Sequence, residues 1–218
     1  MAKTKDLNQR LYYLGLSLII NSAGNALAIS TNLGSAVWTA SAVNLSNLTA
    51  VSLGTTLFIY GVVVTLLNQL LLGTFDRRRF FSNLIFTVPF SYLIALFQFI
   101  FKELGVPTYD FAIRICLDVL GLFMVAVAVS LYSRANLFMH PNDDLTYIIR
   151  FKYIHGNPVL SQWVSYLPPV LVILTCYWLA GKTYAVGFGT IFALLFQGAM
   201  MGWADTHAFT KLKHHIDL

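Results

Sequence analysis

Residues 11–75 contain no Asp, Glu, Lys, Arg or His, and apolar residues dominate this run of 65 positions. A helix that crosses a bilayer needs about 20 predominantly apolar residues. The run therefore predicts two membrane spans, at 11–30 and 52–72, joined by a first connector, residues 31–51, that is also uncharged. Loops that face water usually contain charged residues, so we expect this connector to turn back into the membrane as a re-entrant segment.

Four more apolar segments follow, and each is bounded by charged or turn-forming residues. They lie at 80–101, 112–132, 163–180 and 184–204. With 57% hydrophobic and 11% charged residues in 218, the chain is predicted to be an all-α, polytopic membrane protein with six transmembrane helices in a single domain, 1–218. The formal charge of +5 does not indicate a nucleic-acid partner, because the basic residues flank the spans.

The distribution of basic residues predicts how the spans are oriented. With both termini in the cytoplasm, eleven of the 14 Lys and Arg residues lie inside, and Lys102, Arg114 and Lys182 lie outside. The N-terminus passes directly into the first span without a small-residue cleavage site, which indicates a retained helix rather than a signal peptide. We therefore expect a multi-pass protein of the cell membrane.

Short motifs recur in the two halves of the chain at offsets of 106, 104 and 108 residues. The pairs are Leu14-Gly15-Leu16 with Leu120-Gly121-Leu122, Asn32-Leu33 with Asn136-Leu137, and Gly73 with Gly181. They predict two repeats, at about 11–101 and 112–205, each made of three spans with a re-entrant or interfacial connector helix. Three crossings invert the second repeat, and such pairs place their substrate site where the two interrupted segments meet.

The same connectors contain motifs that resemble those of the YczE/YyaS/YitT-type integral membrane proteins of bacteria. The resemblance extends from about Leu14 to Gly202 and rests on three motifs, Asn32-Leu33-Gly34-Ser35-Ala36-Val37-Trp38-Thr39, Pro141-Asn142-Asp143 and Gly187-Phe188-Gly189-Thr190. Val37 and Thr39 stand where the family has Pro and Asp, and Phe138 replaces a glycine. The resemblance implies a bacterial plasma-membrane protein and bears on fold and location more than on activity.

The strongest candidate site is the second connector, near residues 140–153. Pro141 followed by Asn142, Asp143 and a second acid is typical of a helix start. At the membrane surface the acids would only complement the helix dipole. In a re-entrant segment a carboxylate would mark a contact with an ion, a proton or a cationic substrate. The repeat pairs Asp143 with Thr39, next to Trp38, so we expect these residues to form the central site.

Two further titratable residues have alternative interpretations. His140 precedes the predicted helix and is either a proton-coupled element that titrates near neutral pH or a surface group. Asp118 is the only acid in the fourth span, and Arg114 lies one turn earlier. The two are predicted to pair near the outer interface. The alternative is that Asp118 faces the bundle interior as an outer gate or a proton-relay acid.

Uncharged amides within the spans form a second group of candidates. Asn21 and Asn25 are four residues apart and share one helix face, and with Asn32, Gln98 and Gln197 they are candidates for a polar pathway. Amides also hydrogen-bond between neighbouring membrane helices, so helix packing is the competing interpretation.

No enzyme, cofactor or metal motif occurs in the sequence, and we expect a protein that is not an enzyme. The first hypothesis is a transporter or channel-like protein for a small polar or cationic solute or ion. The second is the substrate-capture subunit of an energy-coupling-factor importer, which would dock on partner transport subunits. The third is a non-transporting membrane scaffold or regulator. Small-residue helix faces also suit a homodimer.

Overall fold

The structure, a computed structural model, describes residues 2–212, and for residues 2–5, 158 and 159 it describes the backbone only. The predicted cytoplasmic end of the chain beyond Leu212 lies outside the described residues. All regular elements in the described part are helices. They are α1 (Ala2–Ser30), α2 (Val37–Thr49), α3 (Leu53–Leu72), α4 (Arg77–Glu103), η1 (Val106–Thr108), α5 (Phe111–Ala135), α6 (Pro141–Ile148), the π-helix η2 (Ile149–Tyr153), α7 (Pro158–Ala180) and α8 (Phe188–His207).

The long helices of the two halves end in the same way. Asn32 just beyond α1 and Asn136 just beyond α5 both have positive φ, 56° and 47°. Gly73 after α3 and Gly181 after α7 also have positive φ, 71° and 69°. Asn and Gly tolerate the left-handed conformation that ends a helix, so the residues that match between the halves in sequence have the same backbone role.

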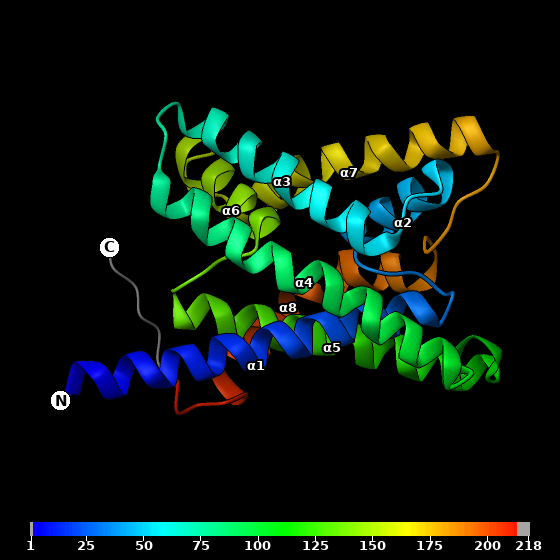
Figure 1. Cartoon of the computed structure of the whole chain (residues 1–218), viewed down its shortest axis with the longest axis horizontal. Helices are drawn as coiled ribbons and strands as arrows, with labels where there is room; N and C mark the ends of the chain where they lie inside the picture. The colour runs from blue at the N-terminus through cyan, green and yellow to red at the C-terminus, as the bar shows by residue number, and fades with distance from the viewer. Residues whose placement is uncertain (1, 213–218) are drawn as a thin grey trace.

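The core of the molecule is the contact between α1 and α5, which lie side by side (Figure 1). A Cβ atom at Gly24 would lie 2.6 Å from the carbonyl oxygen of Gly121, and one at Gly121 would lie 2.7 Å from the carbonyl oxygen of Gly24. Each glycine thus lets the other backbone approach, as small residues do where membrane helices cross.

The two short helices occupy the middle of the bundle. Helix α2 packs on α7, and α6 packs on α3. From the middle of the molecule, α2 and α6 run toward opposite ends (Figure 1). Both connectors therefore contain a helix, as expected, and each of these helices is too short to cross a bilayer.

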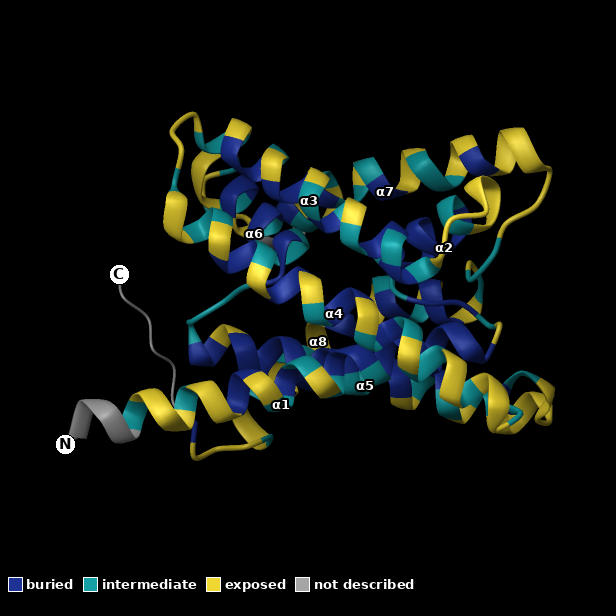
Figure 2. Cartoon of the chain, in the orientation of Figure 1, coloured by how far each residue is buried: buried dark blue, intermediate teal, exposed yellow. Residues whose placement is uncertain are grey.

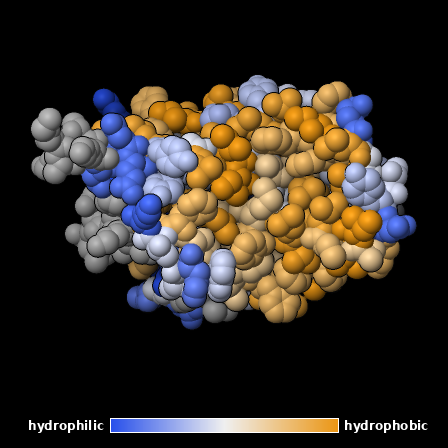
Figure 3. Space-filling view, turned by 90° about the horizontal axis from the view of Figure 1, so that it is seen from below, coloured by the Kyte–Doolittle hydropathy of each residue, from blue (hydrophilic) through white to orange (hydrophobic). Residues whose placement is uncertain are grey.

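Five helices of the described chain are long and apolar enough to cross a membrane, and they lie in α1, α3, α4, α5 and α7. Many residues of these helices are exposed (Figure 2), and they include large apolar ones such as Trp178, which is 82% exposed. On the face that Figure 3 shows, hydrophobic residues cover the middle and hydrophilic residues gather toward the two ends. Such an apolar surface supports a multi-pass membrane protein.

The segment predicted as the sixth span forms α8, which is not among the five candidate spans. Gln197 and Asp205 lower the hydropathy of this helix, and small residues such as Gly198 and Gly202 contribute little to it.

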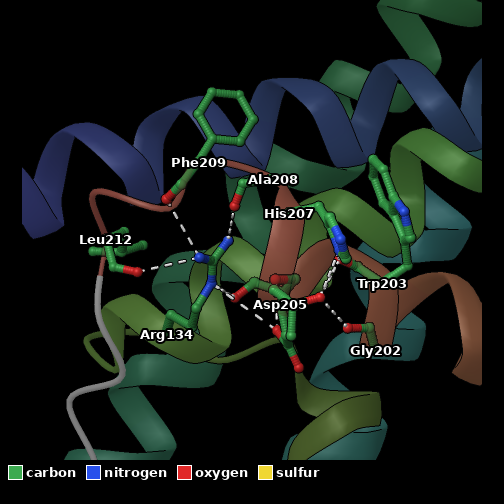
Figure 4. Close-up of polar contacts among 10 residues, drawn as sticks. Arg134, Gly202, Trp203, Asp205, His207, Ala208, Phe209 and Leu212 are labelled. Atoms are coloured by element: carbon green, nitrogen blue, oxygen red, sulfur yellow. Dashed lines mark hydrogen bonds and ion pairs between the residues drawn. The ribbon is translucent and has the colours of Figure 1, made fainter.

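A buried arginine ties the segment after α8 to the end of α5 (Figure 4). The guanidinium of Arg134 is 1% exposed and donates to the carbonyl oxygens of Ala208 at 2.8 Å, Leu212 at 3.1 Å and Phe209 at 3.3 Å. Asp205 lies 4.0 Å from its Nε atom and accepts a hydrogen bond from Ser130. These contacts satisfy the buried charge, so we interpret the cluster as structural.

Candidate functional site

A cavity of about 290 Å³ lies in the middle of the bundle, where the short helices begin. Residues of α1, α2, α4, α5, α6, α7 and α8 line it. Six of the eight residues predicted for a central site are among them: Asn25, Trp38, Thr39, His140, Asn142 and Asp143. We call this space the central cavity.

On one side of the central cavity, three polar side chains form a hydrogen-bonded chain. The Thr39 hydroxyl donates to Asn25 Oδ1 at 2.7 Å, and Asn25 Nδ2 donates to Asn21 Oδ1 at 2.9 Å. All three side chains are buried. Asn21 and Asn25 share a helix face because they are four residues apart, so the amide pair predicted from spacing both lines the cavity and joins α1 to α2.

On the other side, the first turn of α6 presents Asn142 and Asp143 to the central cavity. The hydroxyl of Tyr132, on α5, donates a hydrogen bond to the Asp143 carboxylate. Burial raises the pKa of Asp143 to about 6, and the hydrogen bond from Tyr132 acts in the opposite direction.

His140 is the N-cap of α6, and its ring faces the central cavity. Its Nδ1 atom accepts the backbone N–H of Asn142 at 3.2 Å, and its ring packs edge-on against Phe90, with centroids 4.6 Å apart. Burial lowers the pKa of His140 to about 3. Burial therefore opposes the predicted titration of His140 near neutral pH, and the ring caps α6 through an Nδ1 atom that carries no proton.

The second acid of α6, Asp144, has partners on α4. Its carboxylate accepts hydrogen bonds from Arg79 at 2.9 Å and from Asn83 at 3.1 Å. Burial raises the pKa of Asp144, while the Arg79 guanidinium and the Asn83 amide oppose the shift. Adjacent acids thus differ in role: Asp144 fixes α6 to α4, and Asp143 is left facing the cavity.

A second and larger cavity, of about 590 Å³, adjoins the central cavity on the α6 side. We call it the vestibule. It shares five lining residues with the central cavity, namely Val129, Asp143, Thr146, Arg150 and Met201. Arg78 and Arg79 of the α3–α4 turn also line it. The vestibule therefore joins the central cavity to the end of the molecule that carries this arginine-rich turn.

At the opposite end, the first connector packs tightly against the start of α8. The Gly189 N–H donates to the carbonyl oxygen of Leu33 at 3.1 Å, and a Cβ atom at Gly34 would lie 2.7 Å from the backbone nitrogen of Thr190. Asn44 of α2 exchanges two hydrogen bonds with the backbone of Tyr184, at 2.6 and 2.8 Å. Contacts that involve the backbone therefore hold the first connector against α8 and the segment before it.

Two predicted site residues lie outside the central cavity. Asn32 is exposed and has the left-handed backbone that ends α1, so its role is a turn. Asp118 is fully buried, and its Oδ1 atom accepts the Thr31 hydroxyl at 3.3 Å. Arg114 donates to the Thr31 carbonyl oxygen at 3.0 Å. The predicted pairing of Arg114 with Asp118 is wrong, because both side chains bind the end of α1.

The remaining amide candidates divide in the same way. Gln197 of α8 lines the central cavity, and its Oε1 atom is buried and has no hydrogen-bond partner within the described chain. Gln98 is only partly buried and does not line either cavity. The sequence could not show which of the two glutamines faces the cavity, because each is a single amide in an apolar helix.

Several cavity residues escaped prediction, among them Tyr132, Arg150 and Tyr166. Tyr132 ends a predicted span and is easily taken for an interfacial aromatic residue, and Arg150 contributes to the positive charge that predicts topology. One signal was available, because Arg150 follows Asp143 by seven residues, which is two helical turns and places both on one face.

Neither cavity has the character of a metal centre. Within residues 2–212, no three His, Cys, Asp or Glu side chains lie close enough together to hold a metal ion. The lining of the central cavity combines aliphatic and aromatic side chains with a few amides, hydroxyls and charges, and these polar groups offer hydrogen bonds to a solute.

The five long apolar helices, packed around a central cavity, support a multi-pass α-helical membrane protein. Residues 8–206 match the model of a family described as "Family of unknown function (DUF6198)", and the chain belongs to that family. No curated protein and no solved structure matches the chain.

Proposed function

We propose that this protein is a transporter or channel-like protein of the bacterial cell membrane that moves a small polar solute through the central cavity. In this proposal α8 is the sixth span, and the chain consists of two inverted repeats, each made of three spans and one short helix.

The repeated backbone supports the inverted arrangement. The left-handed residues Asn32 and Asn136 are 104 residues apart, and so are the first residues of the two short helices, Val37 and Pro141. The packing of α2 on α7 has its counterpart in the packing of α6 on α3, as a two-fold axis between the halves requires.

The observation that carries the proposal is the meeting of the two short helices at one cavity. Trp38 and Thr39 from the first turn of α2 and Asn142 and Asp143 from the first turn of α6 line the same space. Interrupted helices whose first turns meet in the middle of a bundle are how many transporters build their substrate site. Trp38, Asn142 and Asp143 belong to the motifs that carry the YczE/YyaS/YitT-type resemblance, whereas Thr39 stands where that group has Asp.

The distribution of positive charge supports an assignment of the side of the membrane that the vestibule faces. Arg77, Arg78 and Arg79 lie at the end where the vestibule lies, and cytoplasmic ends are enriched in Lys and Arg. We therefore propose that both termini are cytoplasmic and that the described conformation faces inward, with the first connector closing the outer side.

The test is solute binding and flux with purified protein. Ions, vitamins, sugars and amino acids are screened by thermal stabilisation in detergent, where a solute at 100 times its Kd adds about 2.7 kcal/mol. Each hit is then tested for uptake into proteoliposomes. Asp143→Asn is compared with Asp110→Asn, which changes an exposed acid outside both cavities.

We expect a hit that is carried into proteoliposomes by the wild type and by Asp110→Asn, and more weakly by Asp143→Asn. Binding without flux, together with co-purification of a transport complex, would favour the capture-subunit hypothesis. If no solute binds, and a cellular phenotype survives Trp38→Ala and Asp143→Asn, the protein is a scaffold and the proposal fails.

A further inference from the structure

The charges of the central cavity consist of one acid and one base. Of the charged side chains that the structure describes, Asp143 and Arg150 line it, and both also line the vestibule. They therefore lie where the two spaces join, and any solute that passes between these spaces passes both charges.

The two charges lie on one side of a continuous helical segment. Asp143 is in the first turn of α6, and Arg150 is in η2, which follows α6 without a break. Seven residues at 1.5 Å each separate their Cα atoms by about 10 Å along the axis. A separation of this order matches the span of a small molecule with a charged group at each end.

Both groups have hydrogen-bonding positions that a solute could occupy. The Asp143 carboxylate accepts the Tyr132 hydroxyl and is not part of an ion pair within the described chain. Arg150 donates its Nε–H to the Gly156 carbonyl oxygen at 2.9 Å, and its guanidinium lies over the Phe151 ring, 5.0 Å from the centroid. Within the described chain these contacts leave the terminal N–H groups of Arg150 available to a solute. An ionised carboxylate accepts several hydrogen bonds, and a guanidinium offers five N–H donors.

The rest of the lining suits a charged but compact molecule. Trp38, Phe90, Tyr132 and Tyr166 place aromatic rings around the cavity, and such rings attract an ammonium group. The unpartnered Oε1 atom of Gln197 adds an acceptor for an N–H group. A volume of about 290 Å³ limits the solute to a small molecule.

We propose that the solute is a small zwitterion of the amino-acid or betaine class, whose ammonium group binds Asp143 and whose carboxylate binds Arg150. This inference rests on the proposed function, because it assigns the solute of the same cavity. A solute with only one charge would leave either Asp143 or Arg150 without a counter-charge, and an unpaired charge in a site screened from water is unfavourable.

The experiment compares each zwitterion with the two molecules made by deleting one charge. The probes are the standard amino acids, β-alanine and glycine betaine, together with the amine that lacks the carboxylate and the acid that lacks the ammonium group of each hit. Binding to the full chain is measured by isothermal calorimetry. The variants are Asp143→Asn and Arg150→Gln, and Asp110→Asn and Arg77→Gln are matched controls at exposed positions that line neither cavity.

We expect at least one zwitterion to bind at least tenfold more tightly than its amine and its acid. Asp143→Asn is expected to weaken the zwitterion more than the acid, and Arg150→Gln to weaken it more than the amine, while the controls leave all three affinities unchanged. A general loss of folding would weaken the binding of all three probes alike and would not produce this selective pattern. The melting temperature and size-exclusion profile of each variant establish that it is folded.

If an amine or an acid binds as tightly as its zwitterion, or if Arg150→Gln has no effect on any bound probe, the inference is wrong and the proposed function stands. The same holds if only uncharged solutes bind. If neither this panel nor the wider library yields a bound solute, the proposed function itself fails.

Discussion

The two connectors have the same position in their halves of the chain and opposite effects on access to the central cavity. The first, residues 31–51, contains no charged residue and packs backbone to backbone against α8. The second contains Asp143, Asp144 and Arg150, and the vestibule lies beside it. Small uncharged residues allow close packing, whereas charged side chains need water or partners and keep space around them.

This comparison indicates that a similar backbone arrangement serves both as a closed and as an open entrance. Side-chain volume and charge decide which one forms. Each of the following predictions perturbs one connector or its contacts with a neighbouring helix. They are given in order of decreasing expected effect.

The first prediction concerns the closed end. Gly34 has a φ of 138°, and a Cβ atom there would lie 2.7 Å from the Thr190 backbone nitrogen. Gly34→Ala is expected to lower the free energy of unfolding by about 3 kcal/mol through overpacking and backbone strain. Chemical denaturation in detergent measures the change. Gly15→Ala is the control, since no atom lies within 4 Å of its added Cβ. Equal stabilities of the two variants would refute tight packing at this end.

The second prediction concerns the contact of α6 with α4. Arg79→Gln leaves the carboxylate of Asp144, which is 4% exposed, with Asn83 as its remaining partner. We expect a loss of about 2 kcal/mol in the free energy of unfolding, because a buried charge then lacks its counter-charge.

Adding Asp144→Asn to Arg79→Gln removes that charge and is expected to restore part of the stability. Arg77→Gln, at an exposed position, serves as the control. A double variant as unstable as the single variant would show that the Arg79–Asp144 pair is not the cause.

The third prediction is a pH dependence at the open entrance. An ammonium group needs the ionised form of Asp143, whose pKa burial raises to about 6. Affinity for a bound zwitterion is therefore nearly complete at pH 7, about half at pH 6 and lost as the pH falls further, with a loss of about tenfold between pH 7 and pH 5. Tyr132, His140, Tyr166, Asp144 and Arg150 are the other titratable or charged groups around this carboxylate.

Calorimetric titrations at several pH values measure the effect. Asp143→Asn, which has no titrating carboxyl group at this position, is expected to bind weakly and with a flat pH profile. A wild-type affinity that does not change between pH 5 and pH 7 would exclude Asp143 as the ammonium ligand.

The fourth and smallest effect is expected in the first connector. Thr39→Val keeps the shape of the side chain and removes its hydrogen bond to Asn25. The expected loss in the free energy of unfolding is about 1 kcal/mol. Thr49→Val, which changes an exposed threonine at the end of α2, is the control. If both variants have the same stability, the Thr39–Asn25 bond does not join the connector to α1.

Much of the helical pattern could be predicted from the sequence, because burial in lipid requires long apolar segments and leaves them visible in the chain. The uncharged connector predicted α2, and Pro141 with its acids predicted the start of α6. The match of Asn32 with Asn136 predicted a repeat, and the structure adds that both residues have the left-handed conformation just beyond a helix. The sixth span was less visible, since Gln197 and Asp205 interrupt its apolar sequence.

The site was predictable where a residue belonged to a local signal. Trp38, Thr39, Asn142 and Asp143 follow directly from the connectors and their repeat. Tyr132 and Arg150 carry no such signal, because a tyrosine or an arginine near a span end has a common interfacial explanation.

The sequence by itself determined that the protein has the long apolar helices of a membrane protein, the order of these helices and the composition of its two connectors. All of these depend on residues close together in the chain. Only the tertiary structure decided that Asp143 faces the cavity while Asp144 binds Arg79, that Asp118 contacts Thr31 rather than Arg114, and that one entrance is closed. Neighbouring residues in a helix point in different directions, and their partners come from segments 60 to 90 positions away, so packing alone assigns their roles.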